Sequence, residues 1–152
     1  MKLAEALQER ADLNRKIEQL RVRLRNNALV QEGEEPAEDP DTLLKELDAS
    51  VTRLEALIVA INQANSVIEK DGRTLTEIIA EKDTLTLKIG AYRELIDAAS
   101  IRTDRYTPTE IRILSSVDVR NLQKKSDAMS KRLRILDNIL QETNWTSEID
   151  FQ

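Results

Sequence analysis

Three carboxylates, Glu77, Glu81 and Asp83, lie near one another in a stretch that the sequence pattern predicts to be helical. Carboxylate oxygens are ligands that Mg²⁺ and Mn²⁺ prefer, so these residues are the best metal-site candidates in the chain. The chain has no histidine and no cysteine, which excludes Glu-x-x-His metal pairs, thiolate ligands and cysteine nucleophiles. A charged face turned to water explains the same residues without any metal. We expect no catalytic residue, no cofactor and no metal, and keep the all-oxygen site as the alternative.

The sequence contains no nucleophile triad, no Walker loop and no dinucleotide-binding fingerprint. Enzymatic activity is therefore unsupported, and we favour a protein that is not an enzyme. Chemistry that uses only carboxylate and hydroxyl oxygens stays open.

Four polar residues stand at positions where a helical pattern would place apolar ones. They are Arg10, Asn65, Lys82 and Ser126. Polar residues in an apolar seam usually fix the register and the oligomeric state at some cost in stability, and this is the role we predict. An internal polar network or a small binding pocket is the alternative.

Basic residues gather in two places, but acidic residues are interspersed and no aromatic residues accompany them. These clusters are Arg21, Arg23 and Arg25, and Lys124, Lys125, Lys131, Arg132 and Arg134. Nucleic-acid sites of this kind combine basic grooves with stacking aromatics, so solvated faces are the better interpretation. With a net charge of −5, we predict no nucleic-acid partner and no membrane partner.

Four stretches of the chain, residues 2–28, 41–67, 74–99 and 118–142, repeat an apolar residue at alternating spacings of three and four. This period is typical of a helix whose apolar seam faces a partner helix. In chain order the seam positions are Leu3, Ala6, Arg10, Leu13, Ile17, Leu20, Leu24; Leu44, Leu47, Val51, Leu54, Ile58, Ile61, Asn65; Leu75, Ile78, Lys82, Leu85, Ile89, Tyr92, Ile96; and Val119, Leu122, Ser126, Met129, Leu133, Leu136, Leu140. We predict a mainly α fold of four long heptad-patterned helices in an antiparallel bundle, forming a single domain over residues 1–152.

The connections refine this arrangement. An acidic linker at residues 31–40 separates the first two helices, and Asp41 after it is the predicted N-cap of the second. Asp71-Gly72 indicates a tight turn, and Thr74 with Glu77 has the spacing of a capping box. Because this turn is too short to span a helix, the second and third helices are predicted to form an antiparallel hairpin.

Period-two alternation appears in two places. Ile111, Ile113 and Val117, in the connection 100–117, predict a short strand before the last helix. The tail alternates in the same way at its large apolar residues, Trp145, Ile149 and Phe151, and is a possible second strand. We expect the two to pair with each other or with a second subunit. Trp145 is predicted to anchor the tail or an interface, with ligand stacking as the alternative.

Several segments together resemble an uncharacterised bacterial family of small helical proteins labelled septicolysin. They are Ile61-Asn62-Gln63-Ala64-Asn65, Asp71-Gly72-Arg73-Thr74-Leu75-Thr76-Glu77, Ala80-Glu81-Lys82-Asp83, Arg105-Tyr106, Glu110-Ile111, Val117-Asp118-Val119 and Asn144-Trp145-Thr146. The label implies a haemolysin-like toxin, whereas the matching segments imply determinants of fold and interfaces. If the family has a site, the resemblance implies that its residues are Asn62, Asn65, Arg73, Glu81, Asp83, Arg105 and Trp145.

A structural or scaffolding protein that forms homo-oligomers is the function we predict. Narrow aliphatic seams and only four aromatic residues leave apolar stripes that a second copy can cover. The absence of cysteine and of a secretory signal favours a cytoplasmic location. A metal- or small-ligand-binding protein and a membrane-active toxin are the alternatives.

Overall fold

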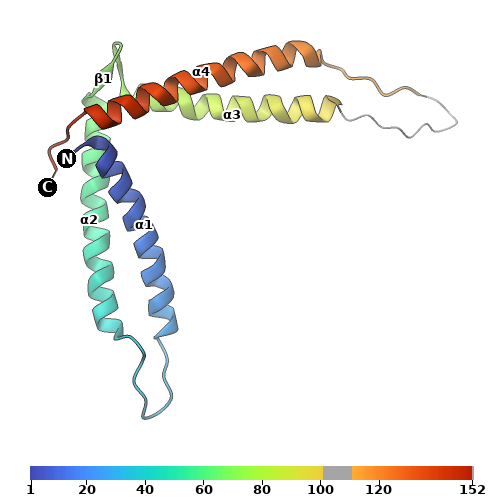
Figure 1. The fold of residues 1–152 in the computed structure, drawn as a ribbon. Helices are drawn as coiled ribbons and strands as arrows, with labels where there is room; N and C mark the ends of the chain where they lie inside the picture. Colours follow the sequence, from blue (N-terminus) through green and yellow to red (C-terminus); the bar gives the residue numbers. More distant parts are fainter. Residues whose placement is uncertain (101–110, 152) are drawn as a thin grey trace. The chain divides into compact units, whose positions relative to one another are not determined.

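The computed structural model describes residues 1–100 and 111–151 and confirms a mainly helical protein (Figure 1). Its elements, in chain order, are α1 (Leu3–Asn26), α2 (Pro40–Val67), β1 (Glu69–Lys70), β2 (Arg73–Thr74), α3 (Leu75–Ser100) and α4 (Val119–Thr146). The described chain therefore has four helices and a short two-stranded sheet that precedes the last helix.

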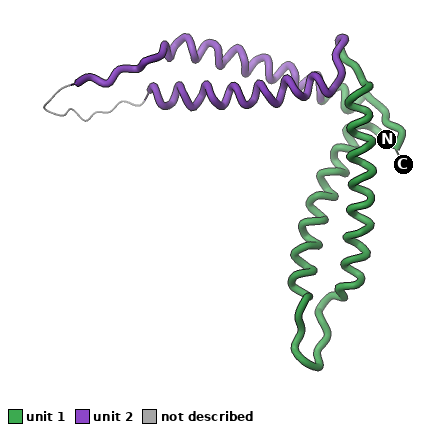
Figure 2. Tube along the Cα trace, turned by 180° about the vertical axis from the view of Figure 1, so that it is seen from behind, with its two compact units in different colours: residues 1–70, 141–152 green, residues 71–140 purple. Residues whose placement is uncertain are grey.

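The chain divides into two compact units (Figure 2). Unit 1 comprises residues 1–70 together with the chain from 141 onward, and unit 2 comprises residues 71–140. The helix pairs found inside the units are α1 with α2 and α3 with most of α4. The antiparallel hairpin of the second and third helices stays a prediction, because α2 and α3 belong to different units. The single domain over residues 1–152 stays a prediction.

Within unit 1, α1 and α2 form an antiparallel hairpin. Ion pairs join Glu9 to Arg53 near one end and Lys16 to Glu46 nearer the loop. The N-cap of α2 is Asp39, whose carboxylate accepts a hydrogen bond from the Asp41 backbone N–H, so the predicted cap at Asp41 is wrong by two residues. Pro40 explains the shift, because its fixed φ suits the first helical position and places the cap immediately before it.

The buried side of α2 differs from the predicted seam. At every second seam position, the residue that is buried is the one just before the predicted residue. The buried residues are Leu43, Ser50, Leu57, Ile61 and Ala64. The predicted seam residues Leu44, Val51 and Ile58 are instead 45%, 46% and 40% exposed. Two of these buried residues, Ser50 and Ala64, have small side chains, and the Ser50 hydroxyl donates to the Glu46 carbonyl within the helix.

The other three helices bury residues of their predicted seams. Fully or nearly buried examples are Leu3, Ala6 and Leu20 on α1, Leu75, Ile78, Ile89 and Ile96 on α3, and Ser126, Leu136 and Leu140 on α4. In these helices one apolar stripe dominates, so its direction is readable from spacing alone.

The short sheet lies between α2 and α3, at the predicted tight turn. Strands β1 and β2 pair around Asp71 and Gly72, whose φ angles are +54° and +77°. Both turn residues are left-handed, which suits the right-handed twist of a two-residue hairpin. The strand predicted in the connection 100–117 lies partly outside the described residues; within residues 111–117 the chain is irregular, and Ile111 and Ile113 are largely exposed. Alternation without a partner edge is insufficient to make a strand.

The C-terminal tail pairs with the N-terminus. Lys2 and Glu148 form one antiparallel bridge, with the Leu3 N–H donating to the Ser147 carbonyl at 3.0 Å and the Ile149 N–H to the Met1 carbonyl at 2.9 Å. The tail is therefore an extended segment with a bridge to residue 2, and not a partner of the residues after α3 that the structure describes.

Candidate functional site

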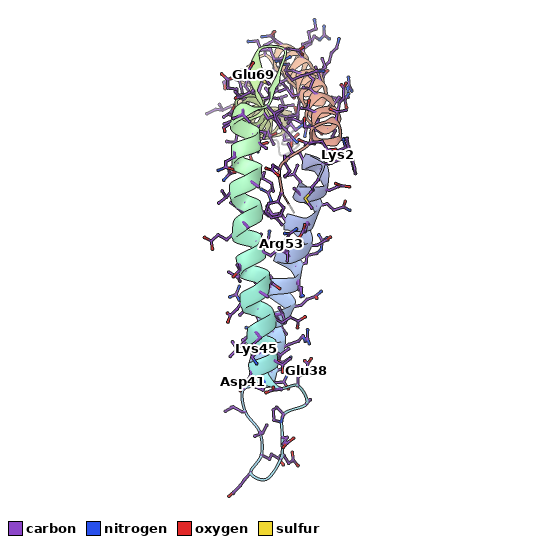
Figure 3. The ribbon with its side chains drawn as sticks, turned by 90° about the vertical axis from the view of Figure 1, so that its left-hand side faces the viewer. Lys2, Glu38, Asp41, Lys45, Arg53 and Glu69 are labelled. Carbon is purple, nitrogen blue, oxygen red and sulfur yellow. The ribbon has the colours of Figure 1, made fainter. Side chains whose placement is uncertain are left out.

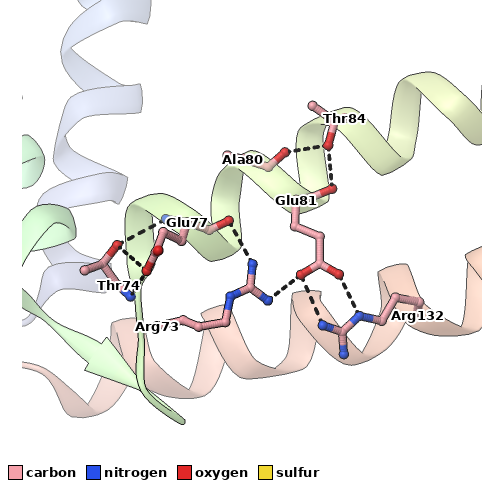
Figure 4. A network of polar contacts seen from close by, with 7 residues as sticks. All are labelled: Arg73, Thr74, Glu77, Ala80, Glu81, Thr84 and Arg132. Carbon is pink, nitrogen blue, oxygen red and sulfur yellow. Dashed lines mark hydrogen bonds and ion pairs between the residues drawn. The ribbon is translucent and has the colours of Figure 1, made fainter.

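Among the described residues of unit 2, the most connected polar group centres on Glu81 (Figure 4). Its carboxylate accepts from Arg132 Nε at 2.8 Å and Nη2 at 3.1 Å, and from Arg73 Nη1 at 2.5 Å. Arg73 comes from β2 and Arg132 from α4, so Glu81 on α3 joins three elements. Arg73 also donates to the Glu77 carbonyl at 3.3 Å, which ties it to the first turn of α3.

The electrostatics of this group keep Glu81 ionised. Hydrogen bonds from Arg132, and then from Arg73, lower the pKa of Glu81 to about 2 against the opposing effect of burial. The same contact raises the pKa of Arg132. A carboxylate with so low a pKa does not exchange a proton near neutral pH, so Glu81 is suited to hold guanidinium groups and not to act as a general acid.

The three predicted metal candidates have different environments. Glu77 closes the predicted capping box, with its carboxylate accepting from the Thr74 N–H at 2.8 Å and its own N–H donating to the Thr74 hydroxyl at 3.2 Å. Glu81 is held by two arginines, and Asp83 is exposed on α3. In the part of the chain that the structure describes, no group of three acidic residues is arranged to hold a metal ion.

The predicted register residues are divided between the units. Lys82 Nζ on α3 lies 2.5 Å from Asp137 Oδ1 on α4, and Ser126 on α4 is 3% exposed, so both contribute to the pairing of α3 with α4. Arg10 on α1 and Asn65 on α2 are half-buried in unit 1. A role for these four residues in fixing an oligomer stays a prediction.

A second polar group, which the sequence interpretation missed, fastens the tail in unit 1. Glu148 pairs with Lys2 at 2.6 Å, and this contact is the main cause of the lowered pKa of Glu148. Arg53, labelled in Figure 3, projects from α2 toward α1 and pairs with Glu9 at 2.7 Å. Its guanidinium also lies 4.3 Å from the centre of the Phe151 ring, a distance typical of a cation–π contact. The alternating apolar residues of the tail indicate an extended segment, but they do not indicate that this segment pairs with residue 2.

The tail also encloses a small hollow beside the C-terminal end of α2. Its volume is about 230 Å³, and its lining residues are Ala60, Gln63, Ala64, Val67, Ile68, Glu148, Ile149 and Asp150. The walls are mostly apolar and carry two carboxylates, with neither a cation nor a nucleophile. Ile149 is 9% exposed and lines the hollow together with residues of α2, so the hollow lies between the tail and α2.

The other candidates implied by the resemblance are not brought together. Asn62 is exposed on α2, and Trp145 is 58% exposed, so its role as an anchor of the tail or of an interface stays a prediction. Arg105 lies outside the described residues. Of that set, only Arg73 and Glu81 are joined directly in the part of the chain that the structure covers.

These features define a class: a helical protein with an antiparallel α-hairpin unit and a second helical unit, each fastened by ion pairs. The chain belongs to the Family of unknown function (DUF6847), whose model matches residues 10–149. It is also similar to a solved structure described as "Crystal structure of a functionally unknown conserved protein from Corynebacterium diphtheriae", with 39% identity, a TM-score of 0.92 and 99% of each chain covered. No curated protein matches the chain.

The comparisons support the resemblance only as far as membership of a family of unknown function. Neither the family nor the Corynebacterium diphtheriae protein is described as a toxin. None of the helices in residues 1–100 and 111–151 combines the length and apolar character of a bilayer-crossing segment.

Proposed function

We propose that this protein is a self-associating structural component, acting as a cytoplasmic scaffold and not as an enzyme. The observation that carries the proposal is the exposed stripe of Leu44, Val51 and Ile58 along α2. We call these three residues the α2 stripe. They recur at every seventh position, which keeps them on one side of a helix that packs against a neighbour.

The two sides of the α1–α2 hairpin differ in character. Because successive helical residues are about 100° apart, Arg53 lies about 200° around α2 from Val51. One side therefore carries the ion pairs of Arg53 with Glu9 and of Glu46 with Lys16, while the opposite side carries the α2 stripe. A row of exposed apolar side chains is common at protein interfaces, and a second copy is the partner present wherever the chain is made.

Sedimentation velocity over micromolar concentrations tests the proposal. We expect the wild-type chain to sediment above its 17.3 kDa monomer mass, reaching twice that mass as concentration rises. Val51→Glu places a charge in the stripe and should shift the protein to the monomer, since burying an unpaired charge is strongly unfavourable.

Thr52→Glu is the matched control, because Thr52 is the exposed neighbour of Val51 and lies outside the α2 stripe. It should associate like the wild type, and circular dichroism should show the same helical content for all three proteins. A wild-type chain that stays at 17.3 kDa throughout, or a Val51→Glu variant that associates normally, contradicts the proposal.

A further inference from the structure

The outward face of α4 carries a row of basic side chains. Arg120, Lys124, Lys131 and Arg134 are exposed and fall within an arc of about 80° on the helix, over an axial length of about 21 Å. We call these four residues the α4 basic row. Among the residues that the structure describes, none of the four has an ion-pair partner, whereas the neighbouring Arg132 is taken up by Glu81. Asp127 lies in the same arc, where it accepts a hydrogen bond from Gln123, so four basic side chains surround one carboxylate and the surface stays positive in a chain of net charge −5.

The loop between α1 and α2 carries several acidic side chains of the opposite charge. Glu38 in this loop pairs with Arg23 at the end of α1, and Asp39 caps α2, so both are used inside unit 1. Glu32, Glu34 and Glu35 are exposed and have no ion pair among the described residues. Gly33, with φ of +85°, turns the chain between them.

We infer that the loop at residues 31–37 of one copy docks on the α4 basic row of a second copy. Charge complementarity carries the inference, because Glu32, Glu34 and Glu35 gather at a turn that the Glu34 N–H closes on the Gln31 carbonyl at 3.0 Å, and this compact acidic group faces no cation among the described residues of its own unit. The absence of aromatic side chains on the row and the negative net charge of the chain favour an acidic protein segment over a nucleic acid. This inference rests on the proposed function, since it adds a second contact between copies.

The contact has a consequence for the assembly. The loop and the row are different surfaces, so each copy that donates a loop still presents a free row, and the contact is head-to-tail. The α2 stripe by itself yields pairs, whereas the added contact links pairs into rings or longer chains. The two contacts also respond oppositely to salt, because screening weakens the ionic contact while burial of apolar surface persists.

Paired charge reversals test the inference. Lys124→Glu with Lys131→Glu reverses the row, and Glu32→Lys with Glu35→Lys reverses the loop. In low salt we expect the wild type to form assemblies larger than the dimer, and each double variant to stop at the dimer. An equimolar mixture of the two variants should regain the larger assemblies, because each reversed loop then meets a reversed row and each native loop a native row. Raising the salt from about 0.05 M to about 0.5 M should weaken the larger wild-type assemblies about tenfold, leaving dimers.

Lys88→Glu with Arg93→Glu on α3 is the matched control, because both residues are exposed and the change in net charge equals that of the row variant. It should assemble like the wild type. Larger assemblies that survive high salt, reversals without effect, or a mixture that fails to regain assembly would overturn the inference while leaving the stripe-dependent dimer, and with it the proposed function, intact. Binding of a short DNA duplex that is lost in the row variant and kept in the loop variant would also overturn it. A wild type that is monomeric in low salt overturns both.

Discussion

The role assigned to Glu81 changes once its neighbours in the structure are known. Its spacing from Glu77 and Asp83 made it a metal candidate, but its carboxylate holds Arg73 from β2 and Arg132 from α4. These partners are 8 and 51 positions away along the chain. Spacing within one helix predicts local groups such as the Thr74–Glu77 capping box, and it carries no information about a side chain that arrives from another helix.

We predict that Glu81→Gln lowers the free energy of unfolding of unit 2 by on the order of 1 kcal/mol at pH 7, a figure reduced for solvent screening. The folded-state pKa of about 2 lies below the ordinary 4.5, so this stabilisation is present above pH 4.5 and is lost as pH falls toward 2. Urea unfolding followed by circular dichroism at several pH values measures the difference between variant and wild type.

Asp83→Asn serves as the control, since Asp83 is exposed on the same helix. It should unfold like the wild type at every pH. A difference for Glu81→Gln that stays constant between pH 7 and pH 2 would contradict the assigned contact.

At the scale of elements, α2 shows that sequence periodicity predicts a helix but does not by itself predict which side of the helix is buried. Its apolar residues cover more than one side, so the spacing of three and four fits two phases that differ by one residue. The sequence interpretation chose the phase with the larger side chains, Leu44, Val51 and Ile58. In the structure the buried phase contains Leu43, Ser50 and Leu57, and the small Ser50 side chain leaves room for a facing helix.

The buried side of α2 predicts different losses of stability for substitutions at two neighbouring residues. Leu57 is fully buried, so Leu57→Ala should cost about 2–4 kcal/mol in the free energy of unfolding. Ile58 is 40% exposed, so Ile58→Ala should cost less than about 1 kcal/mol while weakening self-association. Chemical denaturation at low protein concentration measures both. Equal losses, or a greater loss at Ile58, would place the α1 contact on the other phase.

At the scale of the whole molecule, the two ends of the chain meet within unit 1. The tail pairs with the residues before α1, and Ile149 seats it against α2 while Phe151 lies beside Arg53. The last turn of α4 therefore belongs to the same unit as the first turn of α1. This closure depends on residues that are separated by almost the full length of the chain.

Ile149→Asp should release this closure, because it puts a charge into a site that is 9% exposed. We expect faster hydrogen exchange at the Leu3 and Ile149 amides, whose bonds to Ser147 and Met1 join the ends. Trp145→Ala is the control, since Trp145 is 58% exposed, and it should leave both exchange rates unchanged. Unchanged protection in Ile149→Asp, or equal loss in Trp145→Ala, would show that other contacts hold the tail.

The sequence by itself determined the helices, the turn at Asp71-Gly72, the capping box and the buried sides of α1, α3 and α4, because each depends on residues within a few positions of one another. Only the tertiary structure decided which phase of α2 faces α1, where the sheet forms, what the tail pairs with and which arginines hold Glu81. These features join residues far apart in the chain, and their free energy depends on the shape and charge of a partner surface that does not exist until the helices pack.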